Sequence, residues 1–479
     1  MKKLVYGIMC FAAMTAADSF AAETLTESDT FASLVILPIP GQIYSAEDIS
    51  RPEFMVSNAV DAQTWTIGGD IVSQYFDVEY QNNTAPGIAK AIVTGKAGTE
   101  YEGASAEGEF VVYQTMYVNP SAASSEPYTT RETGAATLAD AIACANASNW
   151  AAKIVMATGN YTGSGYSLAT PIMVVGETGD PKDVVLTDSV NGSRAFTIDN
   201  KYAGVCNLTI TGTGWRTSYN YGTISYGGHI KMSAGKVDNC VISGGYAAGN
   251  HTGGWGRGFG GNVYMSGGRL LRSKITQGHG AAFKAGAADD GHTGRGGGVC
   301  AEGDAVVDSC LIYANGNESR TLGGGIYLDG SAVAVNCTIV DNVTGTDVAG
   351  AGFYIASSTA RAINCVMFGN GGNEIAEFGG VNLGQFAYCA SSVTNESCVT
   401  WKVIDETAFR DWSRRAEDVA CLRPRNDGVL VGSGSTIVEY EDCGGMATED
   451  LFGHERISGS RLDIGCFASR RRGLILYLR

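Results

Sequence analysis

The chain has 479 residues, including 66 Gly and only 9 Pro, and 17% of its residues are charged. This composition excludes a collagen-like or largely disordered chain and is typical of short strands joined by tight turns. The formal net charge of −16 argues against nucleic acid and anionic membrane surfaces as partners, because no basic stripe is present to neutralise phosphates.

The amino terminus predicts a Sec-type signal peptide over residues 1–21. Lys2 and Lys3 precede an apolar run from Leu4 to Ala17, and small residues follow at the expected cleavage site. The run is shorter than the ~20 residues that a membrane span needs. We therefore expect no membrane span and a mature protein that is secreted, extracellular or attached to the cell surface.

Residues 40–114 alternate apolar and polar positions between turn clusters, which predicts a small antiparallel β-sandwich. The run Phe76–Gly87 resembles the Ig-like modules of bacterial surface proteins, which act mainly as spacers. A linker is expected over residues 115–130. Residues 137–145 then form the best amphipathic helix of the chain, in a position to cover the open end of the repeats that follow.

Six copies of a short pattern follow, each with an Asn-like residue, a small residue, any residue and an aliphatic residue. Their second residues are separated by 32, 33, 37, 27 and 28 positions, and they are Leu208, Cys240, Ser273, Cys310, Cys337 and Cys365. A second marker, usually a Gly-Gly pair before an apolar residue, runs in phase with them. Short strands joined by Gly-rich turns at a nearly fixed period predict a solenoid.

We interpret each repeat as one turn of an all-β, right-handed, single-stranded parallel β-helix over residues 131–380. Closing coils and a C-terminal cover are expected over residues 381–468. A short basic and apolar tail over residues 469–479 completes the chain.

The two ends of this region resemble the choice-of-anchor Q domain proteins, which are secreted β-helix proteins of the pectate-lyase-like superfamily. The resemblance is carried by the opening Ile154–Tyr161 and by the closing segments Asp450–Arg456 and Leu462–Phe467, and it covers roughly residues 130–468. It implies the fold and an extracellular or surface setting more firmly than any activity. It also implies that Asp463 caps a turn.

Cysteine and asparagine recur at fixed positions of the repeats. Cys240, Cys310, Cys337 and Cys365 should point inward and stack as buried free thiols, because in-register strands give poor disulfide geometry. The cysteines outside this ladder are the better disulfide candidates, namely Cys389, Cys398, Cys421, Cys443 and Cys466. A second ladder, of Asn207, Asn239, Asn336 and Asn364, is expected to bond turn backbone groups rather than a ligand.

Three successive repeats carry insertions of 6, 7 and 10 residues at one corner, so their loops should stack. Aromatic rings with interspersed charges suit sugar rings, although the same aromatics could instead pack the loops themselves. The predicted ligand-binding residues are Trp215, Tyr219, Tyr221, His251, Trp255, Arg257 and His292.

Catalytic signals in the same loops are weaker. His279 with Asp289 and Asp290 resembles parts of the polygalacturonase-type hydrolases, but the order of the motifs is reversed. Under a lyase alternative, Lys284 or Arg295 would act as the base beside a Ca²⁺ ion held by the two aspartates. The spacing of the three loop histidines does not predict a transition-metal site, so no metal or other cofactor is expected otherwise.

The favoured hypothesis is a non-catalytic secreted or surface protein that binds a polysaccharide or another cell-surface ligand through the stacked loops. The alternative is a polysaccharide lyase or glycoside hydrolase that uses the same loops.

Overall fold

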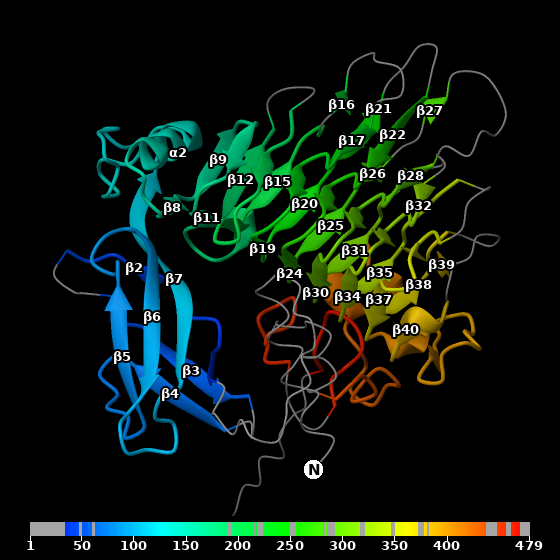
Figure 1. The fold of residues 1–479 in the computed structure, drawn as a ribbon. Helices are drawn as coiled ribbons and strands as arrows, with labels where there is room; N and C mark the ends of the chain where they lie inside the picture. Colours follow the sequence, from blue (N-terminus) through cyan, green and yellow to red (C-terminus); the bar gives the residue numbers. More distant parts are fainter. Residues whose placement is uncertain are drawn as a thin grey trace, which may run out of the picture. The chain divides into compact units, whose positions relative to one another are not determined.

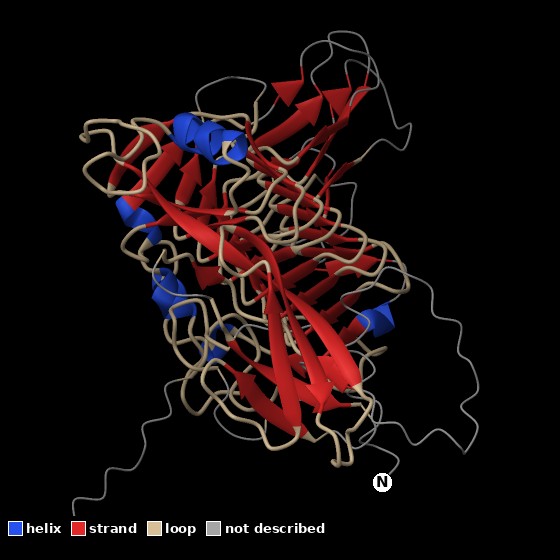
Figure 2. Cartoon of the chain, turned by 60° about the vertical axis from the view of Figure 1, so that its left-hand side comes forward, coloured by secondary structure: helices blue, strands red, loops and turns tan. Residues whose placement is uncertain are grey.

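The structure is a computed structural model. It describes residues 34–46, 50–59, 63–188, 193–214, 216–217, 224–249, 255–280, 283–284, 293–316, 321–345, 350–371, 378–380, 383–436, 448–456 and 461–469. The expected signal peptide and the tail beyond residue 469 lie outside these residues. Strands dominate the described chain, with a single α-helix (Figures 1 and 2). No helix among these residues is long and apolar enough to cross a membrane.

The chain divides into two compact units, the first holding residues 1–155 and 170–172 and the second holding residues 156–169 and 173–479. The first unit contains a three-stranded antiparallel sheet in the order β1-β3-β4 and an antiparallel sheet in the order β5-β6-β7, with β2 and β8 alongside β7. The bounds are β1 (Leu34–Ile36), β2 (Gln42–Ile43), β3 (Glu53–Asn58), β4 (Thr64–Gly68), β5 (Phe76–Gln81), β6 (Gly87–Gly95), β7 (Ser105–Val118) and β8 (Ala152–Met156).

Both antiparallel sheets contribute to one hydrophobic core. Phe54, Val56 and Ile67 come from the first sheet, and Phe76 and Phe110 come from the second; all five are buried. Alternation along β6, where every second residue is buried, explains why this sequence forms a half-buried strand. The unit thus has the small sandwich that the sequence predicts.

The structure differs from the linker that the sequence predicts over residues 115–130. Strand β7 continues to Val118, and the residues after it return to the strand through hydrogen bonds of Asn119 N to Ala135 O and of Tyr117 N to Tyr128 O, at 2.9 and 2.8 Å. Helix α2 (Leu138–Ala147) then begins at the N-cap Thr137, whose hydroxyl accepts a hydrogen bond from Asp140 N. The segment is therefore an ordered part of the first unit, because its backbone groups find partners on β7.

The second unit is built from three parallel sheets that the chain visits in turn, so that each repeat forms one coil (Figure 1). The first sheet contains β11 (Ile172–Gly176), β14 (Gly204–Cys206), β19 (Lys236–Asp238), β24 (Arg269–Leu271), β30 (Val306–Asp308), β34 (Val333–Val335), β37 (Arg361–Ile363) and β40 (Phe386–Ala387). The second contains β9 (Gly159–Thr162), β12 (Val184–Thr187), β15 (Thr209–Thr211), β20 (Val241–Ser243), β25 (Lys274–Thr276), β31 (Leu311–Tyr313), β35 (Thr338–Val340), β38 (Val366–Phe368), β41 (Ala390–Ser391) and β42 (Lys402–Val403). The third contains β10 (Tyr166–Leu168), β13 (Phe196–Ile198), β18 (Ile230–Met232), β23 (Val263–Met265), β29 (Val299–Ala301), β33 (Ile326–Leu328), β36 (Phe353–Ile355) and β39 (Phe378–Gly380).

This is a right-handed parallel β-helix. The repeat period predicts its parallel coils, and the resemblance implies its hand. The coils continue to β42, beyond the expected end of the repeats at residue 380, since strands β40, β41 and β42 still pair in parallel with the coil before them. The repeat pattern fades there because the closing coils keep the backbone pairing without the Gly-Gly turn.

The cysteine ladder lies inside the coils, as predicted. Cys240, Cys310, Cys337 and Cys365 are buried, and each thiol lies 3.3–3.4 Å from the carbonyl oxygen two residues earlier. Burial raises the pKa of each of these thiols, which keeps them protonated.

The disulfide expectation was wrong for the described cysteines. Cys389, Cys398, Cys421 and Cys466 are free thiols, and Cys443 lies outside the described residues. Cys389 extends the inner ladder: its backbone pairs into the next coil, and its thiol meets the Ala387 carbonyl at 3.3 Å in the same way as the others. Its side chain therefore points into the interior of the coils.

The coils contain a second asparagine ladder, which was not predicted from the sequence. Asn262, Asn315, Asn342 and Asn370 are fully or almost fully buried, and the amide of each donates to backbone carbonyls at the corner between the second and third sheets. Asn315, Asn342 and Asn370 also bond one another amide to amide at 2.9–3.0 Å. The predicted ladder is confirmed in part: Asn239 Nδ2 donates to Gly179 O and to Asn207 Oδ1, at 2.8 and 2.9 Å, and Asn364 Oδ1 accepts from Ser435 N at 2.7 Å. All four predicted residues, Asn207, Asn239, Asn336 and Asn364, have left-handed backbone angles with φ of 50–60°.

A histidine takes the place of asparagine in an earlier coil. His229 precedes β18 as Asn262 precedes β23, and its Nε2 lies 2.9 Å from Ser243 O. Its Nδ1 lies 3.3 Å from the buried carboxylate of Asp188, which also accepts hydrogen bonds from Thr213 N and Gly214 N. Burial opposes ionisation of Asp188, but His229 and the two N–H donors outweigh it and lower the pKa of this carboxyl.

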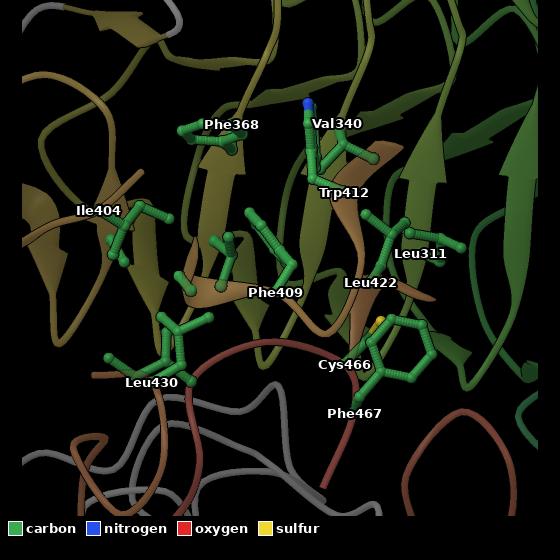
Figure 3. Close-up of a cluster of buried hydrophobic side chains, with 14 of the residues drawn as sticks. Leu311, Val340, Phe368, Ile404, Phe409, Trp412, Leu422, Leu430, Cys466 and Phe467 are labelled. Carbon is green, nitrogen blue, oxygen red and sulfur yellow. The ribbon is translucent and has the colours of Figure 1, made fainter. Parts of the chain in front are cut away.

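The chain has a C-terminal cover after the closing coils, and this cover lies on the outer face of the second sheet. Phe409, Trp412, Leu430 and Phe467 pack onto outward side chains such as Phe368 (Figure 3). Short 3₁₀ turns carry this segment, namely η3 (Glu406–Ala408), η4 (Trp412–Arg414) and η5 (Val419–Leu422). We call residues 405–468 the C-terminal cover.

Aspartates of the two closing motifs hold the cover together. Asp463 accepts hydrogen bonds from Gly432 N and Ser469 N, at 2.7 and 2.6 Å, which confirms its expected structural role. Asp450 is buried and accepts from the backbone N–H groups of Phe452 and His454. Both motifs therefore have a structural role.

Candidate functional site

The long loops stack in register, as predicted, and form small parallel sheets beyond the coils (upper right in Figure 1). One has the order β16-β21-β26, and the other has the order β17-β22-β28-β32, with β27 paired to β22. Their bounds are β16 (Arg216–Thr217), β21 (Tyr246–Gly249), β26 (His279–Gly280), β17 (Ile224–Tyr226), β22 (Trp255–Phe259), β28 (Gly294–Arg295), β32 (Thr321–Leu322) and β27 (Phe283–Lys284). The second of these loop sheets leads into the third sheet of the coils through the Gly-rich turns.

Several predicted site residues lie outside the described residues, namely Trp215, Tyr219, Tyr221, His251, Asp289, Asp290 and His292. For Trp255 and Lys284 the structure describes the backbone, which pairs them across β22 and β27. Arg257 is half-buried in β22, opposite Ile224. His279 is half-buried in β26, with its ring centroid 5.9 Å from that of Tyr246.

Arg295 is the predicted residue around which the structure gathers a complete set of side chains. It ends β28, directly before a turn in which Gly296 has a φ of +62°. A Cβ atom at Gly296 would lie 1.9 Å from Val299 O, so only glycine fits there. This tight turn brings the Arg295 side chain back over the outer face of the third sheet.

The outer face of the third sheet carries a ladder of mostly aromatic residues at the middle of successive strands. Tyr264, Cys300, Tyr327 and Tyr354 are in register from β23 to β36. The residues on either side of each point into the coil and are buried aliphatics or aromatics. The rings of Tyr327 and Tyr354 are parallel, with centroids 5.7 Å apart.

Arg295 lies between two rings of this face. Its guanidinium carbon is 4.7 Å from the ring centroid of Phe259 and 4.9 Å from that of Tyr327. Its Nη1 is 2.9 Å from Glu302 Oε1 and 3.6 Å from Asp329 Oδ2.

The tyrosines complete the network. Tyr264 donates its hydroxyl hydrogen bond to Glu302 Oε2 at 2.8 Å, and Tyr327 donates to Asp329 Oδ2 at 3.4 Å. We call Phe259, Tyr264, Arg295, Glu302, Tyr327 and Asp329 the Arg295 cluster.

The cluster mixes buried rings with accessible charges. Phe259, Tyr264 and Tyr327 are buried, whereas the side chains of Arg295, Glu302 and Asp329 are 30%, 22% and 34% exposed. The rings therefore serve mainly to pack and orient, and the three charged groups are the ones that a ligand can reach.

The surroundings of the cluster keep its tyrosines neutral and its arginine charged. Burial raises the pKa of Tyr264, and its hydrogen bond to Glu302 adds to the shift. Burial likewise raises the pKa of Tyr327. Burial alone would lower the pKa of Arg295, but neighbouring groups that include Glu302 outweigh it and raise that pKa. Arg295 is thus a permanent cation and not a proton-transfer group.

The cluster does not fit a calcium site. Both carboxylates share a guanidinium, and a divalent cation would have to displace Arg295 to reach them. Within the part of the chain that the structure describes, no group of three or more His, Cys, Asp or Glu side chains is arranged to hold a metal ion.

The sequence placed Arg295 in the right region, but it did not identify Tyr264, Glu302 and Asp329. A signal was available. The middle residue of each strand after the Gly-rich turn must face outward, and an acid follows two positions after Cys300 and Tyr327. The insertions alone do not reveal this pattern, because it lies in the strands and not in the long loops.

Comparisons with known proteins identify no family for the chain. No family model matches it, and no curated protein sequence matches it. Among solved structures, it is similar to pectate lyase Pel9A, at 15% sequence identity and a TM-score of 0.42, covering 74% of this chain and 96% of that chain. It is also similar to the Dettilon tailspike protein gp208, at 14% identity and a TM-score of 0.30, covering 58% of this chain and 62% of that chain. Neither similarity transfers a site residue to this chain.

Proposed function

We propose that the protein is a non-catalytic, secreted or cell-surface β-helix protein that binds a polysaccharide or another cell-surface glycan at the Arg295 cluster. The observation that carries the proposal is the half-exposed ion network of Arg295, Glu302 and Asp329 above an ordered aromatic face. Sugar hydroxyls can donate to the carboxylates and accept from the guanidinium. The half-buried Tyr226 and Tyr354 flank the cluster and offer partial ring surfaces to a sugar.

The same network argues for binding rather than cleavage. A glycoside hydrolase needs one protonated carboxyl as the acid and one carboxylate free to act as a base or nucleophile. In the Arg295 cluster, Glu302 and Asp329 each accept from a tyrosine and lie beside the same cation. They are therefore positioned as hydrogen-bond acceptors for a ligand.

The setting outside the cytoplasm belongs to the proposal as well. Its support is the expected signal peptide, together with the resemblance of the closing motifs to choice-of-anchor Q domain proteins. The structural roles of Asp450 and Asp463 are compatible with that resemblance.

The test compares Asp329→Asn with the wild type in affinity electrophoresis on a panel of neutral and acidic polysaccharides. Asp329 is the most exposed acid of the cluster, and Asn keeps the Oδ1 acceptor that Gly330 N uses. We expect retention by the bound polysaccharide to weaken about tenfold, a loss typical of one charged hydrogen bond, at an unchanged melting temperature. Asp427→Asn, which removes an exposed charge from the C-terminal cover, should retain wild-type binding.

Two outcomes would overturn the proposal. A wild-type protein that no polysaccharide retains would remove the binding function. New reducing or unsaturated ends that appear with the wild type and disappear with Asp329→Asn would replace binding with the lyase or hydrolase alternative.

A further inference from the structure

A second site lies on another face of the coils. A pocket of about 400 Å³ opens between the outer face of the second sheet and the C-terminal cover, and Val241, Lys274 and Phe452 are among its lining residues. A neighbouring pocket of about 530 Å³ is lined by Thr209, Val241 and Thr276, among others.

The two pockets form one groove. Both are lined by Val241, and Lys274 and Thr276 are alternate outward residues of the same strand, β25. Outward residues of β15, β20 and β25 form the floor, and the cover borders it through Phe452 and Leu422. The next strand, β31, contributes Leu311, which the cover buries. Hydroxyl groups of Thr209, Ser243 and Thr276 line one half of the groove.

Lys274 is the unusual charge in this groove. Within the described chain it forms no ion pair, and its ammonium lies 5.1 Å from the ring centroid of Phe452. Arg272, two residues earlier, is by contrast paired with Asp238 and Glu449. A partly buried cation without a counter-ion is unexpected in a chain with a net charge of −16.

The pKa of Lys274 supports this description. Burial lowers it, and the neighbouring positive charge of Lys182 lowers it further. Asp180 and Asp418 raise the pKa of Lys274, but less than burial and Lys182 lower it, so the folded protein disfavours the charged form of Lys274.

We propose that this groove binds an acidic sugar chain, with a carboxylate or sulfate group of the sugar at Lys274. The unpaired ammonium supplies the counter-charge, the ring of Phe452 lies beside it, and the hydroxyl-lined floor suits sugar hydroxyls. A peptide that adds a strand is a poor fit, because β20 and β25 are already paired on both sides. The site is separate from the Arg295 cluster and does not depend on the function proposed for it.

The test uses the full chain and three probes: polygalacturonate with carboxylates, dextran sulfate with sulfates, and unsubstituted dextran. We expect Lys274→Gln to weaken binding of one acidic probe about tenfold or more and to reduce its salt dependence. Lys236→Gln removes an exposed lysine of the first sheet and should bind like the wild type. Dependence on the carboxylated or on the sulfated probe identifies the acidic group.

Folding is controlled within the same experiment. Removing a partly buried, unpaired cation should leave the melting temperature unchanged or raise it, so lost binding would not reflect misfolding. Asp329→Asn should leave the Lys274-dependent binding intact, which separates this site from the Arg295 cluster. Equal binding by the wild type and Lys274→Gln, or no preference of the wild type for an acidic probe over dextran, would refute the proposal.

Discussion

Two asparagines of one repeat have opposite roles. Asn342 is fully buried, and its side chain donates to Ile312 O, Val340 O and Asn370 Oδ1 while it accepts from Asn315. Asn336 is equally buried, but within the described part of the chain neither polar atom of its amide has a hydrogen-bond partner. Its backbone has a φ of 52°, a conformation that glycine adopts without strain.

Substitutions of these two asparagines should therefore change the free energy of unfolding by different amounts or in opposite directions. Asn342→Ala leaves several buried groups without partners and should lower the free energy of unfolding by about 3 kcal/mol or more. Asn336→Gly removes an unpartnered amide and a strained backbone, so stability should be unchanged or higher by about 1 kcal/mol. Denaturant unfolding measures both, and equal losses for the two variants would contradict this assignment of the ladder.

At the scale of elements, the sequence predicts strands and register well. Each coil repeats the same local features, which are Gly-rich turns, asparagines with left-handed backbone angles and cysteines that point inward. Their spacing in the sequence therefore reveals the repeat and its register. The stacking of the long loops also follows from repeat lengths alone.

The Arg295 cluster could be predicted only in part. Its contacts join side chains from β22, β23, β28 and β33 with acids that directly follow β29 and β33, and these side chains meet only when separate coils are in register. The buried asparagine ladder was missed for a related reason. Asparagine recurs at two positions of the repeat, and the sequence does not show at which position the side-chain amides bond one another. The structure shows these bonds between Asn315, Asn342 and Asn370.

The C-terminal cover is an element whose attachment centres on Trp412. The indole packs edge-on against Phe368 with centroids 4.7 Å apart, and the Arg415 guanidinium carbon lies 3.9 Å from its ring centroid. Arg415 also reaches back to Asp341 of the coils at 2.7 and 2.9 Å. Aromatic packing between cover and sheet is thus accompanied by ion pairs of Arg415 with Asp341 and of Arg272 with Glu449.

Trp412→Ala should cost about 3–5 kcal/mol of stability, because it leaves a large cavity between the cover and the sheet. Cys466 is buried in the same cluster, and its pKa is raised to about 12, chiefly by burial. A loosened cover should therefore increase labelling of Cys466 by a thiol reagent in the native protein. Arg414→Ala, which removes an exposed side chain next to Ser413, should change neither quantity measurably. If Cys466 in the Trp412→Ala variant is labelled at the wild-type rate, another contact holds the cover on the sheet.

At the scale of the whole molecule, strand β7 serves two different parts of the first unit. Its residues Phe110 and Val112 belong to the sandwich core. Farther along, Met116 and Val118 are buried outside that core, where β7 also contacts helix α2. A boundary at residue 114, which the sequence suggested, would therefore cut through a continuous strand.

This arrangement predicts which fragment folds alone. Residues 34–118 contain every residue of the sandwich core and the complete β7, so the isolated fragment should unfold cooperatively and show dispersed amide NMR signals. Residues 34–104 lack β7, which pairs with β6 along Gly87–Thr94, and should remain unfolded because Phe110 and Val112 are missing from the core. If the longer fragment is also unfolded, the sandwich core is not self-sufficient and the first unit folds only as a whole through residue 155. If the shorter fragment folds, β7 is dispensable to the sandwich, and the role assigned here to Phe110 and Val112 in the core is wrong.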